Sequence, residues 1–134
     1  LRRLAGIATR VVHLAPPASD GQEEWWRDLR TVSLMRALRT RSLPASLVYG
    51  STSGVYGDCQ GAWVPETRAI APSTPRAQRR ADAERAVRHF GRASGVRASI
   101  LRIPGIYAPD RAGGTPRERL MKGTPVLRPE DDVF

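Results

Sequence analysis

The sequence predicts an α/β protein built on a doubly wound parallel sheet. Segments typical of strands alternate along the chain with longer segments typical of helices. The predicted strands are short and rich in β-branched residues, and each one ends at proline or glycine. The order strand, helix, strand, helix, strand at this spacing is typical of parallel βαβ units.

The first strand and the first helix are predicted in the N-terminal third of the chain. Residues 10–14 form a β-branched run that stops before Pro16-Pro17, as expected where a strand ends. Asp20 and Glu23 fit a capping box. An apolar stripe at helical spacing follows, formed by Trp25, Leu29, Val32 and Met35. We therefore expect a helix from Asp20 to about Arg41.

The second strand is predicted over residues 45–49 and leads directly into the glycine- and serine-containing segment 50–57. Residues 58–75 show little periodicity and indicate a long loop, which in a compact domain is often functional. Thr74 is suited to cap a second helix that begins at Pro75.

The second helix carries an apolar stripe formed by Ala83, Ala86, Val87 and Phe90. Gly91 or Gly95 is expected to close it. The third strand is predicted over 98–103, followed by a short helix over 116–121 and a short strand over 125–127.

In parallel α/β sheets, ligands bind beyond the carboxyl ends of the strands. The topology therefore predicts three segments that contribute to a site, namely 15–19, 50–57 and 104–107.

The composition excludes some kinds of site and partner but does not indicate a function. Cys59 is the only cysteine, so no disulfide can form within the chain, and a reducing cytoplasm is the expected location. His13 and His89 lie far apart in the sequence, so no metal site is predicted. No apolar run approaches the roughly 20 residues needed to span a bilayer, so no membrane partner is expected.

The net charge of +9 invites a nucleic-acid interpretation. However, Lys122 is the only lysine, and the arginines are spread along the chain without interleaved aromatic residues. Such a skew is typical of a GC-rich genome and argues against a nucleic-acid partner.

Four segments resemble, in the same order, motifs of extended short-chain dehydrogenases, the group that includes NAD-dependent epimerases and dehydratases of nucleotide sugars. Residues 51–58 read Ser-Thr-Ser-Gly-Val-Tyr-Gly-Asp and resemble the turn after the fifth strand of that family. Segments 11–15, 101–107 and 123–125 resemble its fourth strand, its sixth strand and a downstream Gly-Thr-Pro.

The resemblance implies that 1–134 is a partial NAD(P)-binding, Rossmann-like domain. The glycine-rich N-terminal βα unit and the C-terminal substrate region of the family have no counterpart in the sequence. It further implies NAD or NADP as cofactor, a nucleotide sugar as substrate, and compatibility with a homodimer. The implied cofactor-binding residues are Leu14, Ala15, Pro16, Ser51, Thr52, Pro104 and Gly105. Thr52 stands at the Ser/Thr position of the family's catalytic residues and is the candidate catalytic residue: it either hydrogen-bonds a substrate oxygen or only caps a turn.

The family's catalytic Tyr and Lys, four residues apart on a helix, have no counterpart here. Counting back from Glu84, the resemblance places Arg76 and Arg80 at their positions. Arginine cannot act as a general acid or base near neutral pH. The two arginines either form an anion clamp, since they lie one helical turn apart, or are plain surface residues.

Two functions from different classes therefore stay open. One is an NAD(P)-binding protein of oxidoreductase type that lacks the usual catalytic pair, and whether it is an enzyme is undecided. The alternative is a non-catalytic nucleotide- or protein-binding module on the same fold.

Overall fold

The computed structural model describes residues 5–17, 25–105 and 115–123. The predicted capping box at Asp20 and Glu23 and the predicted strand 125–127 lie outside these residues. In chain order the described elements are β1 (Arg10–His13), α1 (Leu29–Leu38), β2 (Ser46–Thr52), the 3₁₀ helix η2 (Ser53–Tyr56), α2 (Pro75–Ser94), β3 (Arg97–Ile103) and α3 (Pro116–Met121).

The chain divides into two compact units. The first comprises Leu1–Asp58 and Ala69–Ile103, and it holds the sheet together with α1 and α2. The second comprises Cys59–Arg68 and Pro104–Phe134, and its described helix is α3. In α3 the predicted range 116–121 is confirmed, and a capping box between Thr115 and Glu118 starts the helix.

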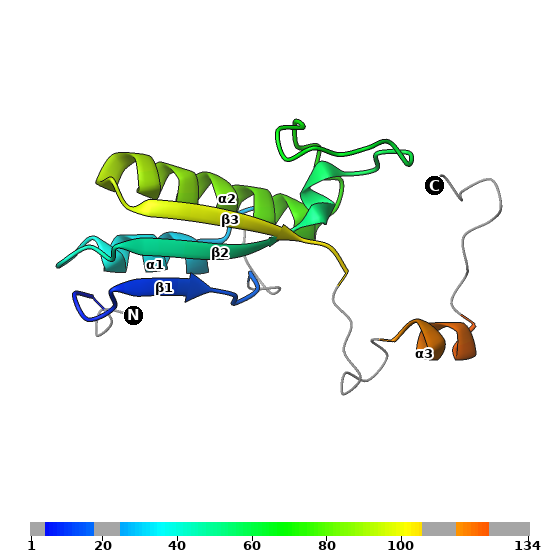
Figure 1. The fold of residues 1–134 in the computed structure, drawn as a ribbon, viewed down its shortest axis with the longest axis horizontal. Coiled ribbons are helices and arrows are strands. Elements are labelled where there is room, and N and C mark those ends of the chain that lie inside the picture. Colours follow the sequence, from blue (N-terminus) through cyan, green and yellow to red (C-terminus); the bar gives the residue numbers. More distant parts are fainter. Residues whose placement is uncertain (1–4, 18–24, 106–114, 124–134) are drawn as a thin grey trace. The chain divides into compact units, whose positions relative to one another are not determined.

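The strands of the first unit form an open parallel sheet in the order β1-β2-β3, as the sequence predicts. Both crossover connections step in the same direction across the sheet, so right-handed crossovers place α1 and α2 on the same face. Figure 1 shows both helices on one side of the three strands. The described residues thus supply one helical layer of a doubly wound fold.

The hydrophobic core lies between this face of the sheet and the two helices. Leu47 and Tyr49 of β2 are fully buried, and Val87 and Phe90 of α2 pack against them. On the opposite face of the sheet, Val12 is 66% exposed. The alternation follows from strand geometry, since successive side chains point to opposite faces.

Helix α1 begins later than the sequence predicts. Asp28 caps it, because its Oδ1 accepts hydrogen bonds from the backbone N–H groups of Arg30 (3.1 Å) and Thr31 (3.2 Å). Trp25 and Trp26 lie in a turn before the cap and are about half exposed. The predicted helical start was wrong because a buried capping aspartate outweighs the apolar stripe that the tryptophans extend.

Helix α2 confirms both of its predicted ends. The Thr74 side chain accepts a hydrogen bond from the Ala77 backbone N–H at 3.2 Å, and Pro75 occupies the first turn. Gly95 ends the helix with φ +72°, and its N–H donates to the Gly91 carbonyl at 2.9 Å. A Cβ on Gly91 would lie 2.8 Å from the Cβ of Ala98, so glycine there lets α2 lie close against β3.

Strand β2 is longer than predicted, because it continues through Gly50 and Ser51 to Thr52 before η2 begins. Its extension carries these residues to the carboxyl edge of the sheet, where parallel α/β folds bind ligands.

Candidate functional site

The turn at the end of β2 is held by Thr52. Its Oγ1 accepts a hydrogen bond from the backbone N–H of Gly54 at 3.2 Å, so the predicted turn-capping role of Thr52 is confirmed. A hydroxyl that accepts in this way still has a hydrogen to donate, and the Thr52 side chain is only half buried. Capping the turn and contacting a ligand are therefore compatible.

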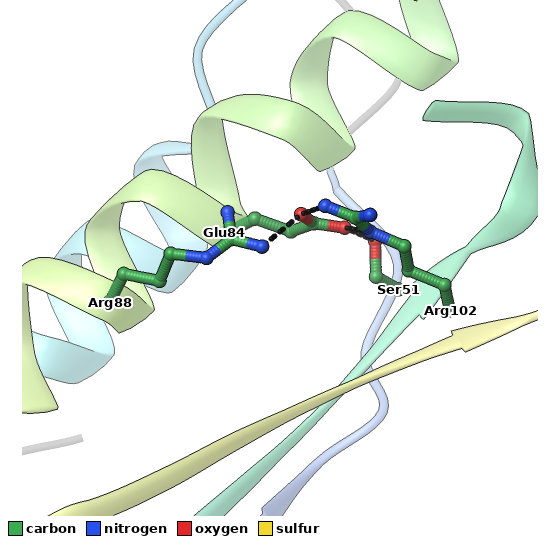
Figure 2. A network of polar contacts seen from close by, with 4 residues as sticks. All are labelled: Ser51, Glu84, Arg88 and Arg102. Atoms are coloured by element: carbon green, nitrogen blue, oxygen red, sulfur yellow. Dashed lines mark hydrogen bonds and ion pairs between the residues drawn. The ribbon is translucent and has the colours of Figure 1, made fainter. Parts of the chain in front are cut away.

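Behind this turn lies a buried ionic network centred on Glu84 of α2, which Figure 2 shows in close-up. The Ser51 hydroxyl donates to Glu84 Oε1 at 2.6 Å. Arg102 of β3 donates from Nε to Oε1 at 3.1 Å and from Nη2 to Oε2 at 2.8 Å. Arg88 of α2 adds an ion pair at 3.1 Å. One carboxylate thus joins α2 to the carboxyl ends of both β2 and β3.

The electrostatics of the network keep Glu84 ionised. Burial opposes its charged form, but the hydrogen bonds from Arg102 and Ser51 outweigh burial and lower the pKa of the Glu84 carboxyl. The same hydrogen bond raises the pKa of Arg102 further above its ordinary value. The Arg102 guanidinium also lies 4.6 Å from the ring centroid of Tyr56, which is buried under the turn.

Arg80 is buried, with 8% of its surface exposed. Its Nη1 donates to the carbonyl oxygen of Gly50 at 2.7 Å and to the hydroxyl of Tyr49 at 3.1 Å. The expectation that Arg80 is a surface residue is therefore wrong. Its hydrogen bonds to protein oxygens also argue against a role in an anion clamp. Arg76 is exposed in the first turn of α2. Helical spacing indicates which side chains share a face, but not what lies opposite that face.

The Tyr49–Arg80 pair is a tyrosine beside a cation, but it is not a substitute for a catalytic pair. Tyr49 is fully buried, and burial raises the pKa of its hydroxyl despite the hydrogen bond from Arg80. A phenol that is inaccessible and harder to ionise than usual does not exchange protons with a ligand at neutral pH. The pair instead fixes the end of β2 to α2.

A second buried polar chain begins at His13, at the end of β1. The Thr31 hydroxyl donates to Asp28 Oδ2 at 2.6 Å, so its oxygen accepts from Nε2 of His13 at 2.8 Å. Burial lowers the pKa of His13, although the charge of Asp28 opposes this shift. His13 is therefore a buried polar residue with a hydrogen-bond partner.

The other face of the sheet carries an apolar surface at the same edge. A Cβ on Gly50 would lie 2.9 Å from Cδ2 of Leu14 and 3.8 Å from Cδ1 of Ile103. Leu14 is 62% exposed. The Pro16 carbonyl accepts a hydrogen bond from Arg30 at 2.7 Å, which holds the segment after β1.

The first unit therefore brings two of the predicted binding segments to one edge, with Leu14, Ala15 and Pro16 after β1 and Ser51 and Thr52 at the end of β2. Pro104 and Gly105 are exposed and belong to the second unit. Within the described parts of the chain, no cluster of three or more metal-ligating side chains occurs. No helix among those parts is long and apolar enough to cross a membrane.

The model of one protein family, described as the NAD dependent epimerase/dehydratase family, matches residues 8–123. This match includes every described strand and both long helices. The chain belongs to the NAD-dependent epimerase/dehydratase family. A search of curated protein sequences finds no significant match.

Solved structures show the same fold as this epimerase/dehydratase chain. UDP-glucuronic acid 4-epimerase from Bacillus cereus in complex with NAD has a TM-score of 0.70 at 21% identity, over 90% of this chain. The same enzyme with UDP-glucuronic acid and NAD gives 0.69 at 24%, over 92%. RMD from Pseudomonas aeruginosa complexed with NADPH gives 0.66 at 23%, over 79%. This chain covers 40%, 43% and 39% of those three chains, respectively.

The sequence analysis did not predict that Glu84 would be the centre of a buried polar network. Its position in α2 did indicate a buried carboxylate. Glu84 falls within the apolar stripe of α2, between Ala83 and Val87, and a carboxylate in that position needs a buried partner. Arg102 lies within an apolar strand, so its position indicated a buried cation that also needs a partner. Nothing in the local sequence indicated that Tyr49 would meet Arg80.

Proposed function

We propose that this chain contributes an NAD(P)-binding edge to an epimerase/dehydratase-type protein that acts on a nucleotide sugar. The observation that carries the proposal is the sheet edge at which exposed Leu14 lies beside Gly50, two residues before the half-buried Thr52, in a chain of this family. Structures of relatives in complex with NAD, NADPH and UDP-glucuronic acid support a dinucleotide and a nucleotide sugar as the two ligands.

The residues present at this edge suit a dinucleotide. The exposed side chain of Leu14 offers an apolar surface to a flat ring, and the backbone of Ala15 offers polar groups beside it. Thr52 offers a hydroxyl to a substrate or ribose oxygen. When bound, the nicotinamide would supply hydride transfer, while these residues bind and orient.

We further propose that acid–base chemistry at this edge differs from that of the family, because Arg76 and Arg80 stand where Tyr and Lys are expected. Arginine stays protonated near neutral pH, and Arg80 is occupied by Gly50 and Tyr49. We therefore expect the protein to bind the dinucleotide but to turn over its substrate in an altered way or not at all.

The alternative function is a non-catalytic nucleotide- or protein-binding module. The burial of Arg80 and the raised pKa of Tyr49 favour it over full catalysis, because both groups serve to hold β2 against α2.

Calorimetric titration of the 134-residue chain with NAD, NADH, NADP and NADPH tests the proposal, with circular dichroism to establish that the chain is folded. We expect saturable binding of at least one dinucleotide. Leu14→Asp should weaken it about tenfold or more, because it removes apolar contact and places a negative charge near an anionic ligand. Leu43→Asp is the matched control, since Leu43 is an exposed leucine of the connection before β2.

Two outcomes would contradict the proposal. A folded chain that binds none of the four dinucleotides favours the non-catalytic alternative. Equal weakening by Leu14→Asp and Leu43→Asp would mean that any bound dinucleotide does not use this edge.

A further inference from the structure

Within the described residues, the end of β2 is held in the sheet from one side only. Strand β1 pairs with β2 as far as Tyr49. Strand β3 pairs further along, with Ser51 opposite Arg102 and Thr52 opposite Ile103. The last residues of β2 therefore depend on β3 and on contacts with α2 for their position.

Helix α2 supplies these contacts from two residues about one turn apart. Arg80 Nη1 donates to the Gly50 carbonyl at 2.7 Å. Glu84 Oε1 accepts from the Ser51 hydroxyl at 2.6 Å, and both Glu84 oxygens accept from Arg102. Figure 2 shows the Glu84 carboxylate between these two partners. Because Ser51 and Arg102 are opposite residues of paired strands, one carboxylate fixes both strands at the same level.

The position of Ser51 also determines where the next side chain points. Successive side chains of a strand point to opposite faces of the sheet. Ser51 points towards α2, so Thr52 points to the other face, on which Gly50 lies against the side chain of Leu14. A displacement of Ser51 would therefore also turn the Thr52 hydroxyl at the candidate edge.

We propose that Glu84 is a positioning residue, which holds the Ser51 hydroxyl and thereby directs the Thr52 hydroxyl towards a ligand at this edge. Glu84 is fully buried, so it acts through Ser51 and does not touch the ligand itself. The identity of that ligand as a dinucleotide rests on the function proposed above. The placement of the turn by Glu84 does not depend on it.

Two substitutions of Glu84 separate positioning from stability. Glu84→Gln keeps an oxygen that can accept from the Ser51 hydroxyl, whereas Glu84→Met has a similar length and no such acceptor. Both remove the charge that compensates Arg102, so both should destabilise the fold. Only Glu84→Met also frees Ser51. If the role of Glu84 were merely structural, the two variants would behave alike.

The test combines ¹⁵N relaxation of the backbone N–H groups of residues 51–55 with calorimetric titration of the four dinucleotides. We expect order parameters near about 0.85 in the unchanged chain and in Glu84→Gln, and about 0.6 or lower in Glu84→Met. Loss of one positioned hydrogen bond should weaken dinucleotide binding about fivefold in Glu84→Met, and less than about twofold in Glu84→Gln.

Phe90→Leu is the matched control for lost stability. Phe90 is a buried core residue of α2, about two turns beyond Glu84. Its substitution removes packed apolar volume and lowers stability, as urea denaturation of each variant measures. It should leave both the order parameters of residues 51–55 and the dinucleotide affinity unchanged.

The proposal is overturned if Glu84→Gln and Glu84→Met change the turn equally, or if Phe90→Leu loosens it as Glu84→Met does. Should Glu84→Met fail to fold, Ser51→Ala removes the same hydrogen bond and keeps the buried ion pair. Unchanged order at residues 52–55 in Ser51→Ala would then overturn the proposal. A folded chain that binds no dinucleotide refutes the proposed function, whereas loss of order in Glu84→Met alone would still support the positioning of Thr52.

Discussion

Glu84 connects three elements through a single carboxylate. It is fully buried, and its partners Ser51 and Arg102 come from the two strands whose ends form the candidate edge. A buried ion pair contributes little over an apolar substitute, but removing one partner is costly because the other charge is left uncompensated. The network therefore makes the position of the Ser51–Thr52 turn sensitive to Glu84.

We expect Glu84→Gln to lower the free energy of unfolding by about 3 kcal/mol, because Arg102 and Arg88 lose their anionic partner. Urea denaturation followed by circular dichroism measures this change. Glu66→Gln, which alters an exposed glutamate of the loop, should stay within about 0.5 kcal/mol of the unchanged chain. Equal unfolding midpoints for the two variants would refute a stabilising role for the network.

His13 gives the protein a pH-dependent stability. Burial lowers the pKa of His13 in the folded chain, whereas in the unfolded chain it is near the ordinary value of about 6.5. Below that pH the unfolded chain takes up a proton that the folded chain does not. Stability from this group is therefore complete above about pH 6.5 and is lost as the pH falls towards the folded pKa.

We expect the unfolding free energy to fall between pH 7.5 and pH 5.5, by at most about 1.4 kcal/mol per pH unit from this group. His13→Gln should flatten that slope, whereas His89→Gln, which removes an exposed histidine, should keep it. Denaturant titrations at the two pH values make the comparison. A slope unchanged in His13→Gln would assign the pH dependence to other groups.

At the scale of elements, the loop after η2 is fixed by the backbone at Gly57. Gly57 has φ +75° and ψ −156°, a conformation that essentially only glycine adopts. A Cβ there would lie 2.3 Å from the carbonyl oxygen of Ala71, while the Ala71 N–H bonds the Val55 carbonyl at 3.0 Å. The start and end of the long loop are therefore held together at this glycine.

We expect Gly57→Ala to destabilise the fold by about 3 kcal/mol or more, since it combines backbone strain with a steric clash. Gly95→Ala is the comparison variant, because Gly95 lies in the ordinary left-handed region with φ +72° and ψ 3°, and nothing lies within 4 Å of the added Cβ. It should cost only about 1 kcal/mol from the left-handed backbone. Thermal unfolding of both variants measures the difference, and equal losses would contradict a special constraint on the backbone at Gly57.

At the scale of the whole molecule, the described residues cover one face of the sheet and leave the other open. Val12 and Leu101 lie on that second face and are 66% and 52% exposed. The chain also spans about 40% of the length of the solved structures it resembles. The dinucleotide titration therefore tests the proposed function together with a check that the chain is folded.

The sequence by itself determined the family, the parallel order of strands and helices and the start of α2, and it narrowed the end of α2 to Gly91 or Gly95. These features depend on local spacing and on residues with fixed backbone preferences, such as Pro75 and Gly95. The start of α1 was predicted wrongly, because an apolar stripe does not reveal that Asp28 is buried and caps the helix.

Only the tertiary structure decided the partners of the buried polar groups. Glu84 meets Ser51 and Arg102, and Arg80 meets Tyr49 and Gly50, across separations of 18 to 33 residues. Periodicity indicates which face a residue occupies, whereas a partner depends on how two elements are brought together in space. For this reason the sequence located the edge of the sheet but misassigned Arg80.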